Sequence, residues 1–75
     1  MANTTINKST FTLVLDGSGF AISDQHVIYA FSDTQPSLGV GHSYPPNSQI
    51  TGKVGKKLWA LSRNYDEAIV YSEVE

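Results

Sequence analysis

Apolar and polar residues alternate along several short stretches of the chain, and such alternation is the pattern of β-strands with one buried face. The first stretch is "STFTLVLD", in which Phe11, Leu13 and Leu15 fall on one face. The "DGSG" that follows supplies the aspartate and glycine residues of a hairpin turn. The pattern therefore predicts a strand that ends in a hairpin turn at residues 16–19.

The next stretch, "HVIYAFSD", is apolar on both faces. Val27, Tyr29 and Phe31 fall on one side of the predicted strand, and Ile28 and Ala30 fall on the other. Two apolar faces are typical of a strand at the centre of a sheet or of one shared with a neighbouring subunit.

The middle of the chain, "TQPSLGVGHSYPPNSQITGKVG", contains all three prolines and four of the six glycines. No helical period is present in it, and we expect only one short strand there, around residues 48–51.

Two further strands are predicted in "KKLWALSR" and "DEAIVYSEVE", and the turn-like "NYD" separates them. In the first of these, Trp59 and Leu61 face one way while Leu58 and Ala60 face the other. Two β-rich stretches joined by a short turn are typical of a hairpin, so we expect a terminal hairpin here.

The first nine residues contain few apolar side chains. We therefore expect a flexible N-terminal arm over residues 1–9, followed by a single small β domain over residues 10–75. No window shows the period of an amphipathic helix. The fold class that the pattern predicts is all-β, a small β-sandwich or partly open barrel of about five or six mostly antiparallel strands.

The small size of the chain has an energetic consequence. A domain of 75 residues buries a smaller fraction of its surface than a larger one and is only marginally stable. Disulfides, a metal or oligomerisation usually reinforce such domains, but the chain has no cysteine, and its two histidines are too few for a histidine-only zinc site. We expect neither a metal nor a cofactor, and we expect the chain to form a homo-oligomer or to dock on a larger body.

Charge and hydropathy exclude two classes of partner from our expectations. The formal net charge is -2, with five basic and seven acidic residues, so no field exists to attract a nucleic acid. The longest apolar run near the N-terminus is far shorter than a signal-peptide core or a membrane span, so we expect a chain made in the cytoplasm, without a membrane partner.

Motifs for catalysis are incomplete in this chain. "DGSGF" lacks the further carboxylates of a calcium loop and the Gly-x-Ser-x-Gly spacing of a nucleophile elbow. "GKVGKK" lacks the spacing of a phosphate-binding loop, and solvated lysines at a strand edge explain it better. We therefore expect no catalytic residues and no enzymatic activity.

Candidate contact residues are mostly aromatic. The loop "VGHSYPPN" is exposed and stiff, which suits docking. Trp59 could form a sugar-binding platform with Tyr65 and Tyr71, although burial in the core or in an interface is the more usual place for a tryptophan. The interface residues that we expect are Tyr29, Phe31, His42, Tyr44, Pro45, Trp59 and Tyr71.

Residues 20–73 contain a characteristic order of short motifs: Tyr-Ala, Ser-Asp-Thr-x-Pro, Gly-His, a loop, Leu-Trp-Ala-x-Ser and a valine-containing final strand. This succession resembles small β domains of tailed-bacteriophage virion proteins. In that group a strand that presents the protein to the particle is followed by a glycine- and proline-containing loop and then by the Leu-Trp-Ala strand. Such domains occur as capsid-decoration or head-fibre proteins and within tail and baseplate proteins.

The resemblance implies a function and a location. It implies a non-enzymatic virion structural protein that decorates or cements the capsid, often as a trimer, with the major capsid protein or tail proteins as partners. The alternative is a tail or baseplate component that contacts host glycan through Tyr44, Trp59 or Tyr65.

Overall fold

The structure is a computed structural model, and it describes residues 2–74. These residues form antiparallel β-strands and no helix. The strands are β1 (Ala2–Asn7), β2 (Thr12–Asp16), β3 (Gly19–Ser23), β4 (Val27–Phe31), β5 (His42–Tyr44), β6 (Gln49–Thr51), β7 (Lys57–Ser62) and β8 (Glu67–Val74).

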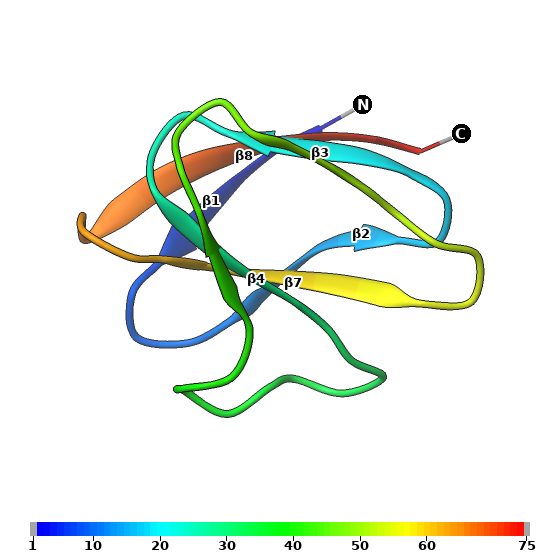
Figure 1. Cartoon of the computed structure of the whole chain (residues 1–75), viewed down its shortest axis with the longest axis horizontal. Coiled ribbons are helices and arrows are strands. Elements are labelled where there is room, and N and C mark those ends of the chain that lie inside the picture. The colour runs from blue at the N-terminus through cyan, green and yellow to red at the C-terminus, as the bar shows by residue number, and fades with distance from the viewer. Residues whose placement is uncertain (1, 75) are drawn as a thin grey trace.

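The strands make two sheets that pack face to face. Sheet A has the order β1-β8-β3-β6, and sheet B has the order β2-β7-β4-β5. Figure 1 shows β1, β8 and β3 in an upper layer above β2, β7 and β4. The predicted fold class is confirmed as a small all-β sandwich, although residues 2–74 contain eight strands where about five or six were expected.

The core lies between the layers and is built from both sheets. Its residues are Ile6, Val14, Leu15, Ala21, Val27, Tyr29, Leu58, Ala60, Ala68 and Val70. The predicted faces of β4 and β7 are confirmed: Val27 and Tyr29 point into this core, as do Leu58 and Ala60. Both faces of β4 are apolar because both are covered: Val27 and Tyr29 lie in this core, while Ala30 and Ile28 belong to a second cluster on the outer face.

A second apolar cluster lies on the outer face of sheet B, beneath the loop of residues 32–41. Phe11, Ala30 and Leu61 are buried in it, and Trp59 packs against them. Figure 1 shows the loop passing below the lower layer. Two hydrogen bonds attach the loop: Trp59 Nε1 donates to the Ser32 carbonyl at 2.9 Å, and Gln35 Nε2 donates to the Phe11 carbonyl at 2.8 Å.

Strand β2 departs from the predicted alternation. Leu13 pairs with Trp59, but Leu15 pairs with Leu58, so the register shifts by one residue between them. This β-bulge lets Val14 and Leu15 both be buried, while Leu13 is 39% exposed on the outer face. The expectation that Leu13 and Leu15 share a buried face is therefore wrong.

Neither predicted hairpin forms. β2 and β3 belong to different sheets, and so do β7 and β8. Each short connection carries the chain from one layer to the other, so the two strands that it joins face the core from opposite sides. At the first crossing the Gly17 N–H donates to the Lys56 carbonyl at 2.9 Å, and Gly17 has a φ of 100°.

Three strands were not predicted, and one of them is β1, in the segment expected to be an arm. β5 (His42–Tyr44) lies within the proline-containing segment beside β4, and β3 (Gly19–Ser23) follows the first turn. The inward positions of β3 hold Ala21 and Ser23 while the outward positions hold Phe20 and Ile22, so its large residues do not face the core. The short strand expected around residues 48–51 is confirmed as β6, at Gln49–Thr51.

The flexible arm expected over residues 1–9 is not found in the described part of that segment, although Met1 lies outside it. β1 (Ala2–Asn7) is an edge strand of sheet A, and all six of its residues pair with β8. The Ile6 side chain is fully buried and anchors the strand. The Asn7 side chain then closes the turn, since its Oδ1 accepts from the N–H groups of Ser9 and Thr10, each at 2.9 Å.

Candidate docking surfaces

The outer face of sheet A carries an exposed apolar group that we call the tyrosine face. It consists of Phe20 and Ile22 from β3 together with Ile69 and Tyr71 from β8. Ile22 lies directly opposite Tyr71, and the Phe20 and Tyr71 rings lie 6.0 Å apart between centroids. Cross-strand neighbours on one face of a sheet are in contact, so these side chains form one continuous patch.

The position of the tyrosine face is related to the residues on the inner sides of β3 and β8. Their inward positions are occupied by small or short residues, among them Ala21, Ser23, Ala68 and Ser72, which are buried. The alternation of strand side chains then leaves the large residues Phe20, Ile22, Ile69 and Tyr71 outside. The tyrosine face therefore follows from the alternation of buried and exposed positions along β3 and β8.

Polar residues surround the tyrosine face. The ladder registers place Asn3 and Thr5 of β1 beside Tyr71 and Ile69, and they place Gln49 and Thr51 of β6 beside Ile22 and Phe20. The charged residues that the ladder registers put on this face are two glutamates, Glu67 and Glu73, at the ends of β8. An apolar centre with a polar rim is the arrangement of protein–protein contact surfaces.

Tyr71 is tied to one of these glutamates. Its hydroxyl donates to Glu73 Oε2 at 3.1 Å. Partial burial, the hydrogen bond to Glu73 and the negative charge of that carboxylate all raise the pKa of the Tyr71 phenol above its ordinary value. Tyr71 therefore remains a neutral hydrogen-bond donor with its ring on the surface.

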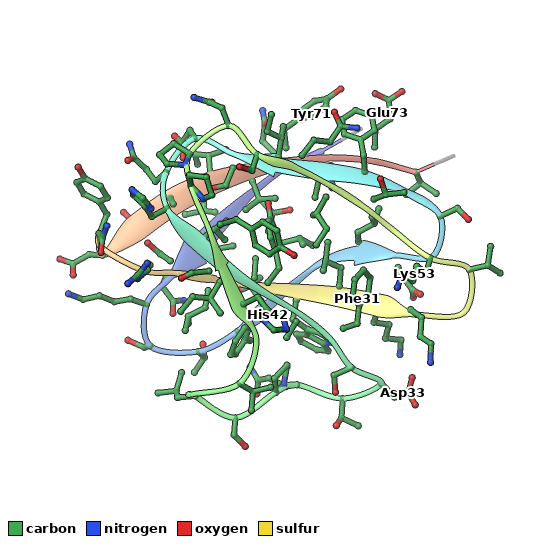
Figure 2. All side chains as sticks on the ribbon, in the orientation of Figure 1. Phe31, Asp33, His42, Lys53, Tyr71 and Glu73 are labelled. Atoms are coloured by element: carbon green, nitrogen blue, oxygen red, sulfur yellow. The ribbon has the colours of Figure 1, made fainter. Side chains whose placement is uncertain are left out.

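A second surface lies at the open end of the sandwich, where the loops after β4 and β6 meet. Figure 2 shows Phe31, Asp33 and Lys53 there, far from Tyr71 and Glu73. The Lys53 ammonium lies 5.2 Å from the centre of the Phe31 ring, within the range of a cation–π contact. A hollow of about 300 Å³ is lined by Phe31, Ser32, Asp33, Lys53 and Lys56.

Phe31 also forms one wall of a neighbouring hollow of about 310 Å³. This second hollow is lined by Tyr29, Ala30, Phe31, Val40, Gly41, His42, Tyr44 and Ile50. Four of the expected contact residues therefore line the same depression: Tyr29, Phe31, His42 and Tyr44. The exposed Pro45 follows Tyr44 directly, at the start of the turn into β6.

Tyr29 is not a surface residue. Its side chain is 2% exposed, and its ring meets that of Tyr44 edge to face at 5.4 Å. The Tyr29 hydroxyl is buried and has no hydrogen-bond partner among residues 2–74. Burial, with a smaller contribution from Tyr44, raises the pKa of this phenol far above its ordinary value. Tyr29 therefore contributes to a contact surface by packing beneath Tyr44, and not through an exposed side chain of its own.

Trp59 does not form a platform with Tyr71. Trp59 lies on the outer face of sheet B under the loop of residues 32–41, whereas Tyr71 lies on the outer face of sheet A. Tyr65 is exposed on the turn between the two layers. The sugar platform of Trp59, Tyr65 and Tyr71 is thus not assembled within one subunit.

Sequence reasoning found Tyr71 but missed its neighbours Phe20, Ile22 and Ile69. The signal was present in "GFAIS", where large apolar residues alternate with small ones. That pattern shows a strand, but it does not show which of its faces is covered.

Comparison of the chain with models of protein families, with curated proteins and with solved structures finds no match. Residues 2–74 contain no group of three or more histidine, cysteine, aspartate or glutamate side chains placed to hold a metal ion. Over the same residues, no helix has the length and apolar character needed to cross a membrane.

Proposed function

We propose that this chain is a non-enzymatic structural protein of a tailed bacteriophage that decorates or cements the capsid. The sequence resemblance suggests the setting, and the tyrosine face is the observation that carries the proposal. Phe20, Ile22 and Tyr71 remain half-exposed on an open sheet although the domain has little apolar surface to spare. Binding to the major capsid protein would bury this face on the virion.

The physical effect of such binding follows from mass action. A protein that binds the assembled lattice and not its dispersed subunits stabilises the lattice. Each buried Å² of apolar surface contributes about 25 cal/mol. Burial of the tyrosine face therefore favours docking, and this gain acts against the translational and rotational freedom that is lost when the two bodies associate. The polar rim and the two glutamates would select a neutral or basic partner surface.

The test uses heads that lack the decoration protein. Adding the purified chain should raise the temperature at which the heads rupture. Ile69→Lys places a charge in the tyrosine face and should abolish this rise, because the lysine would have to be desolvated on docking. Val54→Lys is the matched control, since Val54 is 84% exposed in the loop between β6 and β7, away from the face.

Two outcomes would contradict the proposal in different ways. No change in rupture temperature with the unmodified chain would count against cementing. A rise with Ile69→Lys equal to that of the unmodified chain would leave cementing in place and remove the tyrosine face from it.

A tail or baseplate component that contacts host glycan is the second candidate, and the hollow beside His42 and Tyr44 favours it. An aromatic wall next to polar groups suits a sugar ring, which has an apolar face and hydroxyl edges. Ala30 lines this hollow and pairs directly with Trp59, so Trp59 fluorescence should report on occupation. Quenching by host glycan, without any effect on the heads, would favour this candidate over the first.

A further inference from the structure

The two sheets leave four edge strands, and an edge strand exposes unpaired N–H and C=O groups to which another chain can add. Three of the four have features that block such pairing. β2 contains a bulge. β5 has three residues and is followed by Pro45 and Pro46, and β6 has three residues and is followed by Gly52.

The fourth edge strand, β1, has none of these features. It is six residues long, "ANTTIN", and contains no proline and no charged residue. Its pairing with β8 runs without a register shift from Ala2 to Asn7. Lys8, the nearest charged residue, lies beyond the strand and forms an ion pair with Asp66 of its own chain at 3.2 Å. The outer edge of β1 is therefore regular, uncharged and open.

We infer that β1 pairs antiparallel with β1 of a second copy of this chain. In the proposed pairing a two-fold axis passes through Thr5, so that Thr5 of one copy lies opposite Thr5 of the other. Each remaining residue then lies opposite one whose side chain is on the same face of the sheet. Thr4 and Ile6 then pair on the core side, and Asn3 pairs with Asn7 on the outer side. Thr4 and Ile6 are both β-branched, which suits packing on one face of a sheet. The Asn7 Oδ1 stays in the turn of its own chain, so Asn7 has its Nδ2 to donate to Asn3 of the second copy.

A register centred between two residues would fail. It would place Ile6, which is fully buried, opposite an outward-facing residue of the partner strand. A register centred on Thr4 would preserve the faces but would no longer oppose Ile6 to Thr4, and so would lose this pair of β-branched residues. The arrangement with Thr5 on the axis therefore satisfies the pattern best, and an uncharged strand meets no repulsion from its own copy.

The resulting dimer has one continuous sheet of eight strands, in the order β6-β3-β8-β1-β1-β8-β3-β6. Both tyrosine faces lie on the same side of it, so a single body could engage two equivalent sites. A two-fold contact through one edge closes after two copies, which predicts a dimer rather than the trimer that the resemblance implies. The inference does not depend on the proposed virion role.

The test measures mass in solution, by light scattering behind a sizing column, over a range of concentrations. We expect a dimer for the unmodified chain. Thr5→Lys brings two like charges together on the axis and should remove the dimer peak. Thr51→Lys is the matched control, because Thr51 is also an exposed threonine on an edge strand of sheet A, and this variant should remain dimeric.

A cysteine variant checks the register and does not depend on the stability of Thr5→Lys. The chain has no cysteine, so Thr5→Cys introduces the sole thiol, and two copies paired about residue 5 would bring these thiols within disulfide distance. Under mild oxidation this variant should form a covalent dimer, and Thr51→Cys should not. A monomeric unmodified chain, or a Thr5→Cys variant that links no faster than Thr51→Cys, would overturn the inference.

Discussion

Trp59 and Tyr29 are both aromatic residues of sheet B, but they differ in whether their polar atom has a hydrogen-bond partner. The Trp59 indole N–H donates to the Ser32 carbonyl and so helps to hold the loop of residues 32–41. The Tyr29 hydroxyl has no partner among the described residues. A buried polar group without a hydrogen bond destabilises the folded state, so Tyr29 is a specific point of weakness in the core.

Replacing Tyr29 by Phe should therefore stabilise the protein. The change removes the unpartnered oxygen and keeps the ring that packs against Tyr44, so we expect the free energy of unfolding to rise by about 1 kcal/mol. Urea unfolding followed by Trp59 fluorescence measures this. Tyr44→Phe is the control, since Tyr44 is half-buried, and its free energy of unfolding should change by less than about 0.5 kcal/mol.

The same residue makes stability depend on alkaline pH. Because the folded-state pKa of Tyr29 is raised, the unfolded chain loses this proton first, near its ordinary pKa of 10.0. The contribution of Tyr29 is therefore fully present below pH 10 and is lost as the pH rises above it. Tyr29→Phe should flatten this part of the stability profile. A profile in which the variant falls as steeply as the unmodified chain would refute the assignment.

At the scale of elements, the joining of β3 to β8 depends on a close backbone approach at Gly19. Gly19 has a φ of 143°, and a Cβ atom added there would overlap the Glu73 carbonyl. A side chain would thus push apart two strands that together carry the tyrosine face. The position needs glycine for space as well as for its backbone conformation.

Gly19→Ala should lower the free energy of unfolding by about 2 kcal/mol or more, because both the overlap and the strained φ oppose folding. Gly55→Ala is the matched control. Gly55 also has a positive φ, 76°, but open space surrounds its added Cβ, so we expect a loss of only about 1 kcal/mol. Chemical denaturation measures both variants, and equal losses would mean that the contact with Glu73 is unimportant.

The edge strands are the second feature that belongs to the scale of elements. β1, β2, β5 and β6 all expose backbone groups, but β1 alone among them combines length, regular pairing and lack of charge. Its composition is also what made the segment resemble a loose arm in the sequence, since polar threonine and asparagine residues occur in arms and in outward-facing strands alike.

At the scale of the whole molecule, the accessible surface area shows how compact a single copy is. The described residues expose 4377 Å², close to the roughly 4500 Å² expected for a folded protein of this mass. The described residues are thus as compact as a small domain normally is. The proposed pairing uses the backbone edge of β1, and the proposed docking uses the outer face of sheet A. Asn3 and Thr5 border both surfaces.

The sequence by itself determined the properties that depend on neighbours along the chain. Alternation identified an all-β fold, the two apolar faces of β4 and the inward and outward sides of β7, because side-chain direction in a strand follows from local geometry. Composition likewise excluded disulfides, since the chain has no cysteine.

Only the tertiary structure decided which sheet each strand joins. The crossings at Gly17 and Tyr65 are short turns that could equally close hairpins, and the bulge between Leu13 and Leu15 arises from the pairing of β2 with β7. The exposure of Phe20 and Tyr71 likewise depends on what covers the other face of sheet A. These outcomes come from pairing between distant segments, and the local pattern of one strand does not specify its partner.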